Sequence, residues 1–183
     1  MTDHQSILFT DLQDRERPRL EAILREHQVP LSEEISTVRR WSMACVAWPT
    51  CGLAITESER ALPGVIDVME AELQRLGLSR EALTVRMTGC PNGCARPYNA
   101  DIGLVGKARG RYSVFLGGGR LGTRLNFLYQ DLVPAEDIVP LLVPLFVYFR
   151  DDRHDGESFG DFCQRQGRDD LLARAAQSTF PTK

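Results

Sequence analysis

The spacing of apolar residues predicts helices in the first half of the chain. Residues 15–28 and 63–76 carry apolar side chains at three- and four-residue steps, which is typical of amphipathic helices. Pro18 fits the first turn of the first helix, where a backbone amide would have no helical partner. Gly77 is the expected end of the second helix. Residues 55–62 are predicted to form a short helix just before it.

The second half of the chain changes to strand-like patterns. Short apolar runs bounded by turn residues predict strands at residues 83–87, 101–105 and 112–116. A further short strand is predicted near the start of the chain, at residues 7–9. The last two of these runs are expected to pair as a hairpin, with a turn around residues 108–111. Residues 126–132 predict another short helix, and a strongly apolar helix is expected at residues 138–153.

The composition is that of a folded protein of one or two compact units. Of the 183 residues, 43% are hydrophobic and 26% are charged, which supports a packed core rather than disorder. A net charge of −3 gives no basic footprint for nucleic acid. The first residues form no apolar leader, and the apolar run at residues 138–149 is too short to span a bilayer. We therefore expect a cytoplasmic protein with neither nucleic acid nor membrane as a partner.

Four cysteines form two pairs. Five residues separate Cys45 from Cys51, and three separate Cys90 from Cys94. Glycines and prolines surround both pairs, and these residues let a backbone turn around a bulky group. Thiolates are soft ligands that suit iron–sulfur clusters or zinc. Four thiolates from two such loops match what a [4Fe–4S] cluster needs.

Other uses of these cysteines stay open on spacing alone. Zinc sites usually place about two to four residues between paired cysteines, so the gap between Cys45 and Cys51 fits zinc poorly. Disulfides are rare inside cells, and nothing in the sequence indicates secretion. Free cysteines can also pack as small inert hydrophobes. The fifth cysteine, Cys163, is interpreted as a packed or surface thiol and not as a fifth ligand. The histidines form no ligand pattern and are expected at the surface: His4, His27 and His154.

The residues around the cysteines form several longer motifs. These are CVAWPTCGLA at 45–54, ESER at 57–60, TGCPNGCARP at 88–97, IGLVGK at 102–107, LGGGRLGTR at 116–124 and GESFGDF at 156–162. In this order they resemble the C-terminal part of the siroheme/[4Fe–4S] sulfite reductase family. The nitrite reductase relatives share the cysteine frame, but their first pair resembles Cys-Thr-Gly-x-x-x-Cys. The resemblance therefore favours the sulfite branch, with the nitrite branch as the alternative.

The resemblance implies a fold and a set of ligands. The fold would be α+β, with a mixed sheet and flanking helices, as in the cluster-binding domain of a nitrite/sulfite reductase. The cluster ligands would be Cys45, Cys51, Cys90 and Cys94. Cys94 would also bridge the cluster to the siroheme iron, and a shared thiolate is the shortest route for electrons between the two. Asn92 and Gly93 would lie against the macrocycle.

A second group of siroheme contacts is expected in the glycine-rich segment at 117–119 and just after it. Glycine lets the backbone approach a cofactor closely, so Gly118 is a candidate contact. Arg120 and Arg124 are candidate partners for the siroheme carboxylates, which need several basic side chains. A plain turn and two solvated arginines are the alternative interpretation of the same residues.

The length of the chain limits what it is expected to do alone. Enzymes of this family are several times longer, so residues 1–40 would be the tail of a preceding ferredoxin-like lobe and residues 41–183 the siroheme-facing 4Fe–4S domain. The parent would reduce sulfite to sulfide with six electrons from ferredoxin or an NADPH-linked flavoprotein. This chain, as a cut-down piece or a split gene product, is expected to contain no catalytic residues and to hold siroheme weakly or not at all. A stand-alone iron–sulfur electron-transfer module is the alternative.

Overall fold

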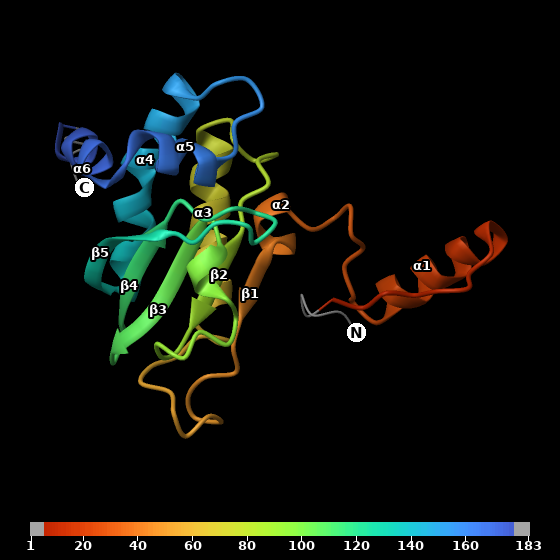
Figure 1. Cartoon of the computed structure of the whole chain (residues 1–183). Helices are drawn as coiled ribbons and strands as arrows, with labels where there is room; N and C mark the ends of the chain where they lie inside the picture. The colour runs from red at the N-terminus through yellow and green to blue at the C-terminus, as the bar shows by residue number, and fades with distance from the viewer. Residues whose placement is uncertain (1–5, 178–183) are drawn as a thin grey trace.

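The computed structural model describes residues 6–177 of the chain. Its centre is a five-stranded sheet whose strands follow the chain order (Figure 1). The strands are β1 (Ser42–Ala44), β2 (Val85–Thr88), β3 (Ile102–Ala108), β4 (Arg111–Leu116) and β5 (Phe127–Pro134). Strands β1, β2 and β3 run parallel, whereas β4 and β5 are antiparallel to their neighbours. This mixed sheet with flanking helices confirms the predicted α+β class.

The helices of the described residues surround the sheet unevenly. They are α1 (Arg17–Glu26), α2 (Thr37–Arg40), α3 (Leu62–Arg75), α4 (Ile138–Asp152), α5 (Phe159–Gln166) and α6 (Arg168–Gln177), with short 3-10 turns η1 (Asp14–Glu16), η2 (Pro97–Asn99) and η3 (Ala135–Asp137). Helices α3 and α4 lie against one face of the sheet, and α5 and α6 pack beside α4 (Figure 1). The segment that contains η2 packs against β2 and β3.

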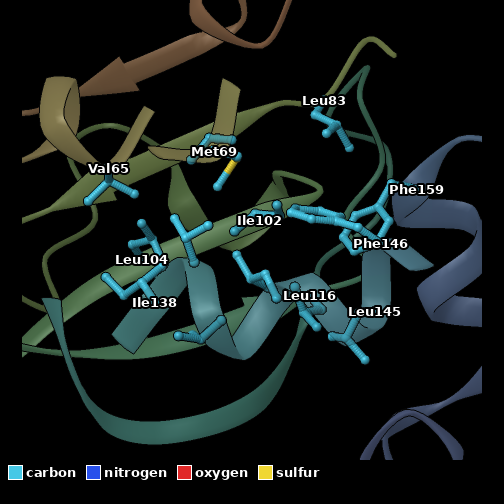
Figure 2. Packing of buried hydrophobic residues seen from close by; sticks show 14 of the residues in the cluster. Val65, Met69, Leu83, Ile102, Leu104, Leu116, Ile138, Leu145, Phe146 and Phe159 are labelled. Carbon is cyan, nitrogen blue, oxygen red and sulfur yellow. The ribbon is translucent and has the colours of Figure 1, made fainter. Parts of the chain in front are cut away.

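The hydrophobic core lies between the sheet and helices α3 and α4. Alternate strand residues point to this side, so Ile102 and Leu104 of β3 are fully buried there. Met69 of α3 and Phe146 of α4 meet them in the same cluster (Figure 2). Each such side chain contributes about 1.5–3 kcal/mol when it is fully buried. The core therefore holds the sheet in place, and the sheet positions the loops at its ends.

The segment before α2 lies apart from this core. Helix α1 contains no buried residue, and it projects away from the sheet (Figure 1). Residues just before and within α2 fix this segment to α3, since the Ser36 hydroxyl donates to Glu70 and Arg39 binds the same carboxylate through two hydrogen bonds of 3.0 and 2.6 Å. Helix α1 fulfils the prediction of a helix at residues 15–28, although it is shorter.

Several predictions for the remaining segments are confirmed. Helix α3 occupies the expected residues and ends before Gly77, which has a φ of +75°. Strands β3 and β4 form the expected hairpin, and α4 forms the expected apolar helix. None of the helices in the described part of the chain combines the length and the apolar character that a membrane crossing requires.

Three short elements were predicted wrongly. Residues 7–9 are exposed and form no strand, because no strand within residues 6–177 lies beside them to share hydrogen bonds. Residues 55–61 form turns instead of a helix, because the amides of Ile55 and Thr56 both bond to the carbonyl of Gly89. Residues 127–134 form strand β5 rather than a helix, since pairing with β4 outweighs the local preference.

Candidate metal centre

The parallel pairing of β1 and β2 brings the two cysteine pairs together. Cys45 directly follows β1, and Cys90 comes two residues after the end of β2. Because the two strands are parallel neighbours, their carboxyl ends lie at the same edge of the sheet. The ladder continues one step further, since the Cys45 amide donates to the Met87 carbonyl at 3.1 Å.

All four predicted cysteine ligands line one cavity. This cavity has a volume of about 330 Å³, and its other lining residues are mostly small or apolar: Met43, Ala44, Val46, Ala47, Leu53, Ala54, Thr88, Gly89, Asn92 and Ala95. Cys94 is exposed, the other three are partly buried, and none forms a disulfide. Four free thiols around one apolar hollow have the donor chemistry that an iron–sulfur cluster requires, so the residues present fit that group.

Geometry separates a cluster from a single metal ion. A tetrahedral zinc site with zinc–sulfur bonds of about 2.3 Å needs its sulfurs within roughly 4 Å of each other. Within residues 6–177, no three cysteine, histidine, aspartate or glutamate side chains come close enough to hold one metal ion. In a [4Fe–4S] cube each thiolate binds a different iron, so the four sulfurs lie further apart. A compact site for a single ion is therefore not formed among residues 6–177.

Gly89 joins the two cysteine loops. Its carbonyl accepts hydrogen bonds from the amides of Ile55 at 2.8 Å and Thr56 at 3.1 Å. A Cβ at this position would lie 2.5 Å from the Thr56 carbonyl oxygen and 2.6 Å from the Cβ of Ala47. No side chain fits in that space, so glycine is required for the first loop to close over the second.

The second cysteine loop is fixed at both sides of its turn. Gly93 has a φ of +74°, a left-handed conformation that favours glycine. The Tyr98 hydroxyl donates to the Pro91 carbonyl at 2.9 Å, and its ring packs edge-on against Phe115 of β4. The loop is therefore held against the sheet face that α3 and α4 leave free.

Two hydrogen bonds reach cysteine sulfur atoms in the cavity. The Gly89 amide donates to Cys45 Sγ at 3.4 Å, and the Asn92 side-chain amide donates to Cys94 Sγ at 3.4 Å. Such donors stabilise negative charge on sulfur and tune the potential of a bound cluster.

The other predicted cofactor contacts lie at the opposite end of the sheet. Leu116, the last residue of β4, pairs with Ile102, the first residue of β3. The segment that follows Leu116 therefore begins at the amino end of β3, where the Gly118 amide donates to the Ala100 carbonyl just after the second cysteine loop. The structure thus brings Asn92 and Gly93 to the cysteines but places Gly118, Arg120 and Arg124 elsewhere.

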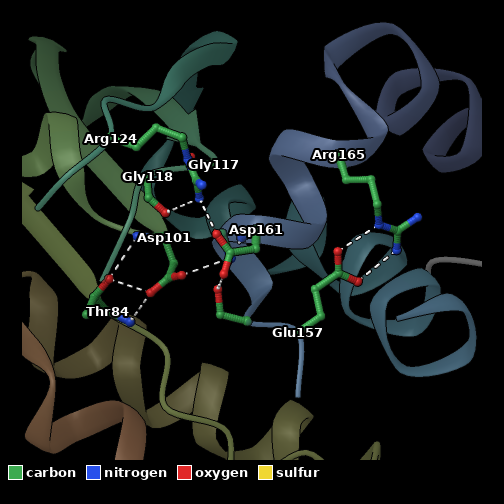
Figure 3. A network of polar contacts seen from close by, with 10 residues as sticks. Thr84, Asp101, Gly117, Gly118, Arg124, Glu157, Asp161 and Arg165 are labelled. Carbon is green, nitrogen blue, oxygen red and sulfur yellow. Dashed lines mark hydrogen bonds and ion pairs between the residues drawn. The ribbon is translucent and has the colours of Figure 1, made fainter. Parts of the chain in front are cut away.

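At that far end, Arg124 is already bound within the chain. Its guanidinium donates to the carbonyls of Gly117 at 2.8 Å and Gly118 at 3.1 Å, and it pairs with Asp161 at 2.7 Å (Figure 3). Arg120 is exposed and lies over the ring of Trp41, with 5.9 Å between guanidinium carbon and ring centroid. Both arginines line a second cavity of about 810 Å³, together with Arg80, Arg150 and Arg153.

At this end of the sheet, a buried carboxylate connects Thr84, just before β2, to the start of α5. Asp101 accepts hydrogen bonds from the Thr84 amide, the Thr84 hydroxyl and the Gly160 amide at the start of α5 (Figure 3). Burial raises the pKa of Asp101, and the hydrogen bonds from Thr84 and Gly160 oppose that shift. Nearby, two hydrogen bonds from Arg165 lower the pKa of Glu157 to about 2. The sequence motifs did not reveal Asp101, because its partners Thr84 and Gly160 come from two segments that are distant in the sequence.

The remaining candidate ligands are excluded by position. Cys163 is fully buried in α5, and burial raises the pKa of its thiol well above the usual value. This confirms its interpretation as a packed thiol. His27 and His154 are exposed, as predicted. His4 lies outside the described residues.

Comparison with known proteins identifies the family. Residues 36–181 match the family model of the nitrite and sulphite reductase 4Fe-4S domain. The chain belongs to this family. The match covers all five strands and both cysteine pairs of this 4Fe-4S domain.

Relatives of the domain carry consistent names. The chain is 49% identical to the sulfite reductase [NADPH] hemoprotein beta-component of Bordetella petrii, over 91% of this chain and 28% of that protein. It is 51% identical to the protein of the same name from Acidithiobacillus ferrooxidans (94% and 30%), and 48% identical to the sulfite reductase [ferredoxin] of Synechococcus elongatus (93% and 27%). The chain therefore spans less than a third of the length of these relatives.

A solved structure has the same fold. The Mycobacterium tuberculosis NirA protein superposes with a TM-score of 0.74 at 27% sequence identity, over 92% of this chain and 32% of that one. The agreement in fold supports the mixed five-stranded sheet with flanking helices described above.

Proposed function

We propose that this chain binds a [4Fe–4S] cluster through Cys45, Cys51, Cys90 and Cys94. The observation that carries the proposal is the single cavity that all four cysteines line at the carboxyl ends of two parallel strands. The apolar lining supports it, because exclusion of water and hydrogen bonds to sulfur are the means by which proteins tune such clusters.

Within a longer parent enzyme, the same domain would serve sulfite reduction. Siroheme would supply the iron at which sulfite is reduced to sulfide by six electrons, and Cys94 would be the thiolate shared by that iron and the cluster. Cys94 is the exposed member of the four, which supports its role as the ligand facing a second cofactor. Residues 1–40 would then belong to the preceding lobe and residues 41–183 to the siroheme-facing domain, in the cytoplasm.

The siroheme contacts would come from two places. Asn92 and Gly93 would touch the macrocycle near the shared thiolate, since they lie in the same loop as Cys94. Gly118, Arg120 and Arg124 would serve carboxylates at the far end of the sheet, where arginines line the larger cavity. Arg120 is the stronger candidate of the two arginines, because Arg124 already binds Asp161 and two carbonyls.

The names of the relatives support a substrate and a class of electron donor for the parent enzyme. The relatives are named sulfite reductases, some with NADPH and one with ferredoxin in the name, so either donor would suit the parent. The residues between Cys45 and Cys51 also favour sulfite over nitrite. We expect this chain to provide no catalytic residue that would bind or protonate sulfite.

Siroheme binding tests how much of this function the chain holds alone. We expect the chain with its cluster to bind siroheme weakly or not at all, and to form no sulfide from sulfite and a reduced dye. The reason is that a polycarboxylate macrocycle needs several basic partners, and Arg120 and Arg124 line a cavity separate from that of the four cysteines. The measurement is a visible titration with siroheme. A stoichiometric siroheme spectrum would contradict the expectation, whereas a cluster without siroheme matches a stand-alone electron-transfer module equally well.

A further inference from the structure

We propose that the Asn92 side chain is a positioning and tuning residue that donates a hydrogen bond to the Cys94 sulfur and thereby raises the reduction potential of the cluster. The inference rests on the proposed function, because it concerns a cluster bound at Cys94. It goes further by assigning to one neutral side chain a specific effect on the electron-accepting group.

The contact is direct. Asn92 Nδ2 lies 3.4 Å from Cys94 Sγ, within hydrogen-bonding distance for sulfur. Both residues line the cavity of the four cysteines. The amide nitrogen carries two donor hydrogens and no acceptor, so its interaction with a thiolate is attractive. Because the amide does not titrate, its effect on the sulfur does not depend on pH.

The fold holds Asn92 in this orientation from both sides. The residue before it, Pro91, is held by its carbonyl, which accepts the Tyr98 hydroxyl at 2.9 Å. The residue after it, Gly93, has a left-handed φ of +74°, and its carbonyl accepts the Arg96 amide at 2.8 Å. The turn between these anchors is short, so the Asn92 side chain and the Cys94 sulfur are kept together before a cluster binds.

The exposed position of Cys94 increases the expected effect of this hydrogen bond on the reduction potential. Cys94 is the exposed cysteine, and it has less protein around it than the other three. Reduction adds an electron and increases the negative charge on cluster and ligands. A donor at the sulfur stabilises that reduced state more than the oxidised one, which raises the potential. A purely structural role of Asn92, as an ordinary turn residue, would leave the potential unchanged.

The test compares potentials in the full chain after anaerobic cluster assembly, by dithionite titration followed by electron paramagnetic resonance. Asn92→Leu keeps the branched shape and removes the donor. We expect the equilibrium constant for one-electron reduction to fall about tenfold, which corresponds to a potential lower by about 59 mV. The matched control is Thr50→Val, which removes an exposed polar group next to Cys51 and should leave the potential unchanged. An Asn92→Leu variant with full iron content and an unchanged potential would overturn the proposal.

A second measurement does not need the cluster. In the metal-free chain labelled with nitrogen-15, the side-chain amide protons of Asn92 should shift when Cys94 is replaced by alanine, and should not shift in Cys163→Ala. If the chain assembled no cluster, the proposed function would fail for this chain, and this measurement would still decide whether the hydrogen bond exists. Unmoved Asn92 signals in Cys94→Ala would refute it.

Discussion

Replacement of Cys90 by alanine is expected to reduce bound iron from about four atoms per chain to less than one. Cys90 is one of two cysteines in the second loop. Among the described residues, the cavity is lined by the four cysteines but by no histidine, carboxylate or fifth cysteine that could replace Cys90. The measurement is iron and acid-labile sulfide per chain after anaerobic assembly.

Cys163→Ala is the control for this substitution. It also removes one thiol, but Cys163 is buried in α5 and is absent from the cavity lining. The control should therefore keep its full iron content. A Cys90→Ala variant that still binds about four irons would show that the four cysteines are not the ligand set.

Replacement of Gly89 by alanine is expected to prevent cluster assembly and to lower the free energy of unfolding by about 1–3 kcal/mol. The added Cβ would lie 2.5 Å from the Thr56 carbonyl oxygen. That oxygen belongs to the backbone and cannot turn away as a flexible side chain could. The two cysteine loops must then separate, which moves Cys45 and Cys51 away from Cys90 and Cys94. Denaturant unfolding of the metal-free chain and iron analysis measure the two effects.

A glycine in the first cysteine loop provides the matched control. A Cβ on Gly52 would have no neighbour within 4 Å, and its φ lies outside the left-handed range. Gly52→Ala should therefore keep both the stability and the iron content of the unchanged chain. Equal behaviour of Gly89→Ala and Gly52→Ala would contradict the view that contact at Gly89 joins the loops.

Local patterns in the sequence were sufficient for elements whose stability is itself local. Helix α3 has the helical period and a glycine at its end, and the β3–β4 hairpin joins neighbouring runs by a short turn. Strand β5 was predicted as a helix, because its conformation is set by pairing with β4 rather than by its own residues. The strand predicted at residues 7–9 failed for the complementary reason, since no strand in the described part of the chain lies beside it.

The candidate metal centre was predictable because its chemistry is concentrated in one residue type. Cysteine spacing identified all four cysteines that line the cavity. The need for Gly89 and the bonds of Asp101 could not be predicted, because each depends on segments brought together by the tertiary fold. For the same reason, the motif around Arg124 did not reveal that its guanidinium binds Asp161 and the loop carbonyls.

The central claim is that four cysteines on this chain hold one [4Fe–4S] cluster. The most direct test is the iron and acid-labile sulfide content of the full chain, purified without oxygen, together with its visible spectrum. If the four cysteines bind the cluster, we expect about four iron atoms and about four acid-labile sulfides per chain, with a broad charge-transfer band in the visible spectrum. The opposite result is a chain that binds neither iron nor sulfide, even after anaerobic assembly, and whose four cavity thiols react freely. This result would contradict cluster binding by the four cysteines.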